Sequence, residues 1–179
     1  NDPSALFLER VFKITRPDGY VAQVLPGNIF NGSATKDLRA HLLDKTKILS
    51  LIGFENHGIF DNIHNQYKFG VIIFRNSGRT DSLNGIFGQT DLNVLTDHTK
   101  KTVNVPRRVL ESYSPEARIF PSVTSQAEVG VLNNILKHPS VSSDYGNNWK
   151  AKAHRELILA YDDEYLVESD EPAGDYPVY

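Results

Sequence analysis

The residues best placed to do chemistry lie in one polar loop between two apolar runs, from Glu55 to Gln66. This loop is rich in Asn and His, and it carries one isolated aromatic residue, Phe60, among polar neighbours. A plain hairpin needs only about two to five connecting residues, so the connection is longer than a turn requires. Loops of this kind tend to carry function. The loop is therefore the first candidate for a functional site.

Two imidazoles, His57 and His64, share this loop and could in principle bind a metal. They lack the spacing of an HExxH motif, and no third ligand stands in an obvious position. Ordinary polar loop residues are the better interpretation, and no metal site is predicted.

Other catalytic patterns are missing from the sequence. It contains neither GxGxxG nor GxxxxGK[ST], the usual phosphate-binding loops. It has no GxSxG and no Cys, so serine elbows and Cys-His pairs are excluded. No acidic residue stands two positions before a Lys, which removes the simplest carboxylate-and-lysine nuclease signature. No catalytic residue is predicted in this chain.

The net charge of -3 argues at first against a nucleic-acid partner, because phosphate binding rests on Lys and Arg. The average hides an asymmetry, since seven acidic residues and no basic ones follow position 161. The preceding residues hold 19 bases and 15 acids, a net charge of +4. Bases cluster at Lys100, Lys101, Arg107 and Arg108. We predict that these four contact nucleic-acid phosphates, and a solvated surface is the alternative.

Length and composition are those of one globular domain, or of a domain with an extension. No apolar run approaches the roughly 20 residues of a membrane span, so no membrane partner is expected. The absence of Cys fits a cytoplasmic protein. The chain has no Met and no signal-like start. We therefore expect that Asn1 is not a natural start and that the chain is a piece of a longer protein.

The elements that must position the loop can be read from periodicity. Residues 4–14 form an amphipathic helix, and residues 20–26 a short strand that we expect to be buried on both faces. Ser33 is expected to cap a second helix, which leads into a strand over 48–54. The strand over 67–74 follows without a helix, so it should run antiparallel to its neighbours. This order predicts an α/β sheet whose ligands bind at the carboxyl ends of its strands.

The later part of the chain is less regular. A strand is expected over 83–87, and a strand and short helix over 103–112. The best-supported element is a helix over 125–137, where Ser125 and Glu128 have the spacing of a capping box. A further strand is expected over 149–160.

Five segments, in this order and spacing, resemble the second half of the catalytic domain of adenine-N6 DNA methyltransferases. The closest resemblance is to the large single-chain methylases of type IIG restriction-modification systems. The segments are ALFLERVF (5–12), RPDGYVAQVLP (16–26), DLR (37–39), IF (59–60) and YKFGVIIF (67–74). The likeness continues through SPEARIF (114–120), the helix at Gln126, residues 149–156 and YPVY (176–179), which resemble a connector toward a target-recognition region.

The resemblance implies a partial Rossmann-like sheet, the second half of a methyltransferase domain with a terminal antiparallel strand, over residues 1–78. An α+β extension would occupy 79–179, with an acidic tail from 162. That family binds S-adenosylmethionine through an upstream glycine-containing motif and grips the adenine with a tetrapeptide such as Asn-Pro-Pro-Tyr. Neither is present here. The chain alone is therefore expected to bind no cofactor and to transfer no methyl group.

The resemblance also implies a role for Phe60, which matches the family position that stacks on an extruded target base. Base extrusion costs a few kcal/mol, and stacking on an aromatic side chain offsets about 1 to 3 kcal/mol of it. Asn28, Phe30 and Pro26 match positions that line the same pocket. A plug for the edge of the sheet is the structural alternative for Phe60.

Three functions remain open at the level of sequence. The leading one is a piece of a DNA adenine methyltransferase, whose partner is DNA and whose parent uses S-adenosylmethionine, with or without a fused nuclease. A non-catalytic DNA-binding or scaffold module is the alternative, and it would bind duplex DNA in a salt-sensitive way. A different α/β enzyme would need a complete cofactor site before residue 75, and none is visible. The oligomeric state is left open.

Overall fold

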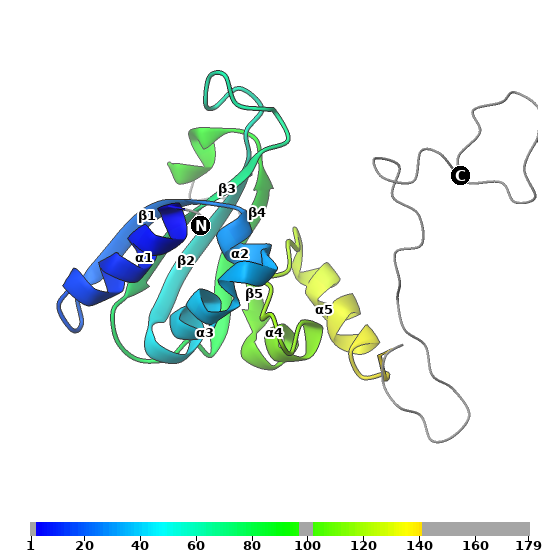
Figure 1. The fold of residues 1–179 in the computed structure, drawn as a ribbon. Helices are drawn as coiled ribbons and strands as arrows, with labels where there is room; N and C mark the ends of the chain where they lie inside the picture. Colours follow the sequence, from blue (N-terminus) through cyan, green and yellow to red (C-terminus); the bar gives the residue numbers. More distant parts are fainter. Residues whose placement is uncertain (1–2, 97–101, 141–179) are drawn as a thin grey trace, which may run out of the picture. The chain divides into compact units, whose positions relative to one another are not determined.

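The fold is mixed α/β, built on one five-stranded sheet (Figure 1). The computed structural model describes residues 3–96 and 102–140. The elements, in chain order, are α1 (Pro3–Ile14), β1 (Tyr20–Pro26), α2 (Asn28–Asn31), the 3-10 helix η1 (Ser33–Thr35), α3 (Lys36–Lys45), β2 (Lys47–Glu55), β3 (Lys68–Arg75), β4 (Ser82–Gln89), the 3-10 helix η2 (Leu92–Leu95), β5 (Val103–Pro106), α4 (Arg107–Tyr113) and α5 (Gln126–Ile135).

The strand order is β1-β3-β2-β4-β5. β3 lies between β1 and β2 and runs antiparallel to both, as predicted from the absence of a helix before it. β1 and β2 therefore point the same way, and β4 pairs with β2 in parallel. The carboxyl ends of β1, β2 and β4 consequently meet at one edge of the sheet. The β2–β3 loop rises from this edge (Figure 1).

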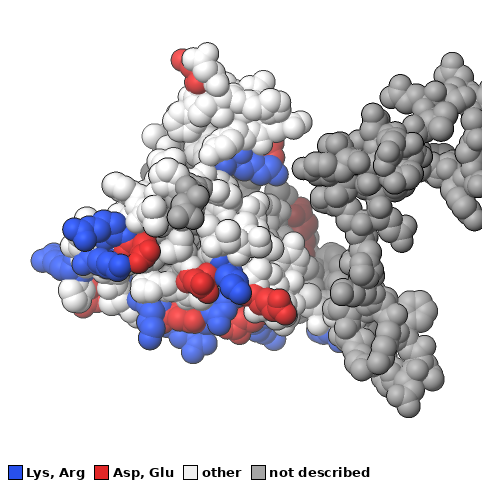
Figure 2. Space-filling view, in the orientation of Figure 1, with Lys and Arg blue, Asp and Glu red and all other residues white. Residues whose placement is uncertain are grey.

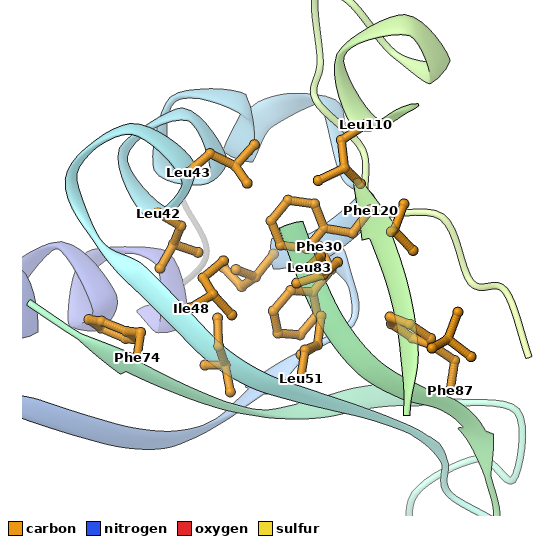
Figure 3. Close-up of a cluster of buried hydrophobic side chains, with 14 of the residues drawn as sticks. Phe30, Leu42, Leu43, Ile48, Leu51, Phe74, Leu83, Phe87, Leu110 and Phe120 are labelled. Carbon is orange, nitrogen blue, oxygen red and sulfur yellow. The ribbon is translucent and has the colours of Figure 1, made fainter. Parts of the chain in front are cut away.

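One face of the sheet packs against the helices and forms the main core (Figure 3). Leu8 of α1 and Leu42 and Leu43 of α3 are fully buried against Ile48 and Phe74 of the sheet. Burying a side chain of this size stabilises the fold by roughly 1.5 to 3 kcal/mol. The helices thus fix the sheet by burying apolar stripes that are visible in the sequence.

β1 differs from its prediction. Only Leu25 is buried along this strand, whereas Tyr20 and Val24 are 72% and 55% exposed. The reason is its position, because β1 pairs with β3 alone and is an edge strand of the described sheet. The run YVAQVLP predicts a strand buried on both faces, but only one face of it packs against the core.

Two predicted helix starts have different outcomes. Ser33 begins the 3-10 turn η1 instead of capping α3, whose N-cap residue is Thr35, without a capping hydrogen bond from its side chain. Ser125 does cap α5, accepting from the amide of Glu128 at 3.3 Å, and the Glu128 carboxylate accepts from Thr124 N at 2.9 Å. The predicted helix at 125–137 is therefore confirmed.

The predicted strand over 83–87 corresponds to β4, and the strand and helix over 103–112 correspond to β5 and α4. The predicted division after residue 78 falls between β3 and β4, inside the same sheet. The strand expected over 149–160 and the acidic tail from 162 lie outside the described residues.

Candidate functional site

The residues predicted to handle a base lie around the carboxyl ends of β1 and β2. β1 ends at Pro26, and the one-turn helix α2 follows with Asn28 and Phe30. β2 ends at Glu55, and the loop that follows carries Phe60. In the sheet, Pro26 and Phe54 both stand opposite Phe69 of β3. The topology thus brings two chain segments, far apart in sequence, to one edge, which is where open α/β sheets place ligands.

Phe60 is half-exposed at this edge. The residue is 41% accessible, and its ring meets Phe69 edge-on, with ring centroids 4.9 Å apart and an angle of 67°. Phe69 in turn stacks on Phe54 at 5.0 Å. Phe60 is therefore held by the sheet on one side and open to solvent on the other. An aromatic ring in this position can receive another flat ring.

Phe60 is held in place by Asn56, a residue that the sequence did not single out. The Asn56 side chain accepts from Phe60 N at 2.7 Å and donates to the carbonyls of Phe60 at 3.0 Å and Ile63 at 2.8 Å. Asn56 is fully buried. Gly58 and Asn62 take positive φ angles of 84° and 62°, which lets the loop fold back on this amide. An Asn directly after a strand is a turn signal that could have pointed to it.

Phe30 lies on the opposite face of the sheet from Phe60. A Cβ at Gly70 would come within 2.7 Å of the Phe30 ring, so this ring rests on Gly70, whereas Phe60 rests on Phe69. Neighbouring residues of a strand face opposite sides. Pro26 pairs with Phe69 and shares the side of Phe60, and the Asn28 side chain is exposed at the start of α2. The four predicted residues therefore lie at one edge of the sheet, where β1 and β2 end, but on its two faces.

The segment that carries Asn28 and Phe30 is clamped by Arg39 of α3. The Arg39 guanidinium is fully buried and donates to the carbonyls of Ile29, Gly32 and Ala117 and to the Thr35 hydroxyl, at 2.6 to 2.9 Å. Burial lowers the pKa of Arg39. No described carboxylate pairs with it, so backbone carbonyls and the Thr35 hydroxyl solvate the charge. Arg39 therefore fixes the end of β1 relative to α3 and to residue 117.

A cavity of about 220 Å³ opens beside this clamp, at the ends of β1, β2 and β4. Its wall is aromatic, and its rim is polar. The lining includes Phe30, Phe54, Phe69, Phe87, Phe120, Asn31, Glu55, Lys68, Ser122 and Thr124. Phe30 stacks on Phe120 with centroids 6.2 Å apart. At the rim, the Lys68 ammonium lies 3.2 Å from the Glu55 carboxylate and holds the pKa of Glu55 below its ordinary value.

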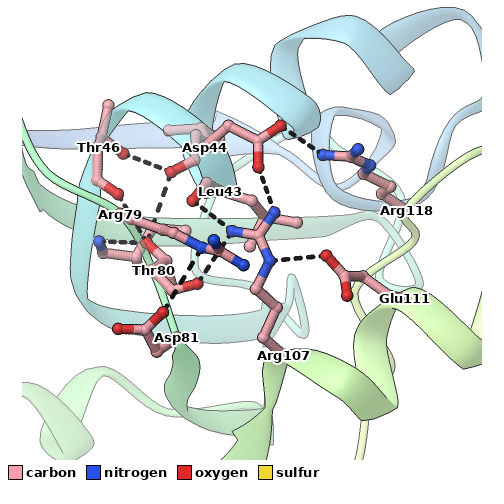
Figure 4. A network of polar contacts seen from close by, with 11 residues as sticks. Leu43, Asp44, Thr46, Arg79, Thr80, Asp81, Arg107, Glu111 and Arg118 are labelled. Atoms are coloured by element: carbon pink, nitrogen blue, oxygen red, sulfur yellow. Dashed lines mark hydrogen bonds and ion pairs between the residues drawn. The ribbon is translucent and has the colours of Figure 1, made fainter.

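The predicted phosphate contacts have mixed outcomes. Lys100 and Lys101 lie outside the described residues, and Arg108 is exposed on α4. Arg107 requires a correction, because its guanidinium is buried and fully engaged within the protein (Figure 4). It pairs with Asp44 and, at 2.7 Å, with Glu111, and it donates to the carbonyls of Leu43 and Thr80. Arg107 joins α4 to α3 instead of reaching DNA.

Charge is distributed unevenly over the described surface (Figure 2). The end that carries the β2–β3 loop is largely uncharged in this view, whereas Lys, Arg, Asp and Glu gather around α1 and at the opposite end. Within residues 3–96 and 102–140, no group of three or more acidic or His side chains could hold a metal ion. In the same residues, no helix has the length and apolar character of a membrane span.

The sheet has an antiparallel strand inserted between two strands of common direction, which is a mixed α/β arrangement. Residues 1–60 match the model of the Eco57I restriction-modification methylase family. The predicted resemblance to restriction-modification methylases is thereby confirmed. Comparison with curated protein sequences gave no significant match.

Solved structures share the fold. The type I restriction enzyme EcoKI M protein aligns at a TM-score of 0.53 and 15% identity, over 80% of this chain and 46% of that one. The type IIG restriction endonuclease BpuSI aligns at 0.50 and 16% identity, over 91% of this chain and 22% of that one. A type I restriction-modification complex aligns at 0.50 and 14% identity, over 74% and 36%. The present chain spans less than half of each, and at these identities the likeness shows the fold.

Proposed function

We propose that this chain is part of a site-specific DNA methyltransferase of a restriction-modification system, which methylates adenine at N6 in the cytoplasm. The observation that carries the proposal is the match of residues 1–60 to a restriction-modification methylase family, combined with a half-exposed ring at the strand ends. A base must leave the stack before an enzyme can modify it. In this proposal Phe60 stacks on the extruded adenine.

The neighbouring strand end completes the proposed base pocket. Pro26 stands beside Phe69 on the side of Phe60, and Asn28 lies exposed at the start of α2, two residues after Pro26. Phe30 reaches the same strand end from the other face and supports it. Arg108, with Lys100 and Lys101, would contact the DNA backbone, whereas the buried Arg107 takes no part.

The methyl donor implied by the family is S-adenosylmethionine. The cavity at the strand ends, at about 220 Å³, is smaller than the roughly 300 to 1,000 Å³ of ordinary small-molecule pockets. The described residues therefore do not by themselves fit the whole donor. In this proposal its main site is formed by another part of the parent protein, and the chain alone transfers no methyl group.

Methyl transfer by the parent protein tests this function. Purified parent protein is incubated with DNA and S-adenosylmethionine, and the DNA is digested to nucleosides and examined for N6-methyladenine by mass spectrometry. Phe60→Ala is expected to lower the rate roughly 5- to 150-fold, because an aromatic stack contributes about 1 to 3 kcal/mol per base.

Tyr67→Ala is the matched control, since Tyr67 is an exposed ring in the same loop. It should leave the rate unchanged. Methylation only at another base, or equal rates for the two variants, would contradict the proposal. Salt-sensitive duplex binding without any methylation would favour the scaffold alternative.

A further inference from the structure

We propose that the cavity walled by Phe30, Phe87 and Phe120 binds an uncharged, planar heteroaromatic ring of nucleobase size. This site is separate from the Phe60 ring, which does not line the cavity. The inference goes beyond the proposed function and stands on its own observations. In this proposal Phe30, which lies on the opposite face of the sheet from Phe60, contacts the ligand directly.

The wall of the cavity is shaped for a flat ligand. Gly53 and Gly70 stand opposite each other on β2 and β3. A Cβ on Gly70 would lie 2.7 Å from the Phe30 ring, and one on Gly53 would lie 3.2 Å from the Phe87 ring. Both rings therefore lie directly on the sheet backbone. Phe120 stacks on Phe30 from the following segment, with ring centroids 6.2 Å apart and an angle of 26°, so the aromatic wall of the cavity is held in place from both sides.

The volume of the cavity fits a ring system but not a whole nucleotide. An apolar cavity of about 150 Å³ is known to accept benzene, and this one measures about 220 Å³. It is therefore large enough for one or two fused rings. A sugar and phosphate would have to remain outside, at the open mouth.

The rim supplies one acceptor and one donor side by side. Glu55 and Lys68 line the mouth, with their charged atoms 3.2 Å apart. A base with an amino group next to a ring nitrogen, such as adenine, can donate to the carboxylate and accept from the ammonium. The two charges pair with each other, and the visible surface around the loop is largely uncharged (Figure 2). These features favour a neutral ring over a free phosphate.

Titration of the 179-residue chain with nucleosides tests the proposal, with binding followed by calorimetry. Adenosine is expected to bind saturably, and purine riboside, which lacks the amino group, at least tenfold more weakly. Ser122→Trp and Asn31→Trp each place a large ring at the mouth from an exposed position, and each should weaken adenosine binding at least tenfold. Ala127→Trp, on the exposed side of α5, is the matched control and should change nothing.

Phe60→Ala separates this site from the proposed target-base site. Adenosine binding should survive this substitution, whatever its effect on methylation by the parent. The absence of saturable binding would overturn the proposal. The proposal would also be overturned if Phe60→Ala abolished adenosine binding while both Trp variants still bound adenosine normally.

Two further probes distinguish where such a ring comes from. A short single strand of deoxyadenosines would supply a DNA base, and S-adenosylhomocysteine would supply a free adenosyl group. Binding of the single strand, lost in Ser122→Trp, assigns the site to DNA. Binding of S-adenosylhomocysteine alone, lost in the same variant, assigns it to a nucleoside cofactor. Both results support the site, whereas probes that bind equally well to Ser122→Trp and to the unchanged chain contradict it.

Discussion

At the scale of single residues, the site depends on two buried polar side chains that hydrogen-bond to backbone groups. Asn56 ties the Phe60 loop together, and Arg39 ties the end of β1 to α3. Both groups satisfy backbone partners that would otherwise be buried without hydrogen bonds, and an unsatisfied group of this kind costs about 1 to 3 kcal/mol. The orientation of the aromatic rings is therefore a consequence of backbone anchoring.

Asn56→Ala is expected to lower the free energy of unfolding by about 1 to 3 kcal/mol and to expose the loop to protease. The reason is that Phe60 N and the Phe60 and Ile63 carbonyls lose their partner. Urea denaturation and limited proteolysis measure the two effects. Asn65→Ala, whose side chain is exposed in the same loop, is the control, and equal behaviour of the two variants would contradict the anchoring role.

Arg39→Met should be more damaging, at about 3 kcal/mol or more, because several carbonyls lose a donor at once. The uncharged Met side chain keeps much of the volume of Arg39, so the loss of stability measures the lost hydrogen bonds. Thermal unfolding compared with Arg10→Met, a position exposed on α1, isolates the effect. A melting temperature that matches this control would remove Arg39 as a clamp.

At the scale of elements, apolar periodicity predicted most helices and strands, and the absence of a helix between β2 and β3 predicted the antiparallel direction of β3. Leu38, Leu42 and Leu43 recur at helical spacing, and the run from Phe69 to Phe74 ends at polar turn residues, so local patterns sufficed. Exposure depends instead on neighbours far away in sequence. The exposed face of β1 and the burial of Arg107 both follow from strand order and helix packing, which periodicity does not encode.

The same limit applies to the candidate site. The family resemblance placed Phe60, Pro26, Asn28 and Phe30 in one pocket, but it could not show that Phe30 takes the other face of the sheet. The difference follows from the strand pairing. Pro26 pairs with Phe69 on one face, whereas Phe30 lies against the next residue, Gly70, on the other face. Arg39 and Asn56 were missed as anchors because their partners are backbone carbonyls and amides.

The capping box of α5 gives a prediction at this scale. Ser125→Ala is expected to cost about 0.5 to 2 kcal/mol, because the amide of Glu128 loses its acceptor. The loss should appear in global unfolding, since Val129 of α5 packs into the main core. Urea denaturation compared with Ser122→Ala tests this, and equal midpoints would mean that α5 unfolds independently.

At the scale of the whole molecule, the ion-pair network around Arg107 makes stability depend on pH. Hydrogen bonding from Arg107 and then from Arg118 holds the pKa of Asp44 below its ordinary value. An acid whose pKa is lowered by folding stabilises the native state above its unfolded pKa and loses this contribution as the pH falls through its folded pKa. Stability is therefore expected to fall below about pH 4.

Asp44→Asn should flatten this part of the pH profile, although the variant is less stable at neutral pH because Arg107 and Arg118 lose a charged partner. Unfolding midpoints measured from pH 2 to pH 7 give both curves. The Glu9→Gln variant, at an exposed ion pair on α1, provides the control. Parallel profiles for Asp44→Asn and the unchanged chain would show that Asp44 does not contribute.

The central measurement is fluorescence of 2-aminopurine placed at the target adenine of the parent protein's DNA site. Extrusion of the base from the stack raises this fluorescence, and Phe60→Ala in the parent should reduce the rise strongly while duplex binding persists. Tyr67→Ala should match the unchanged protein. An undiminished rise in Phe60→Ala, with normal methylation, would show that the half-exposed ring at the end of β2 does not receive the base.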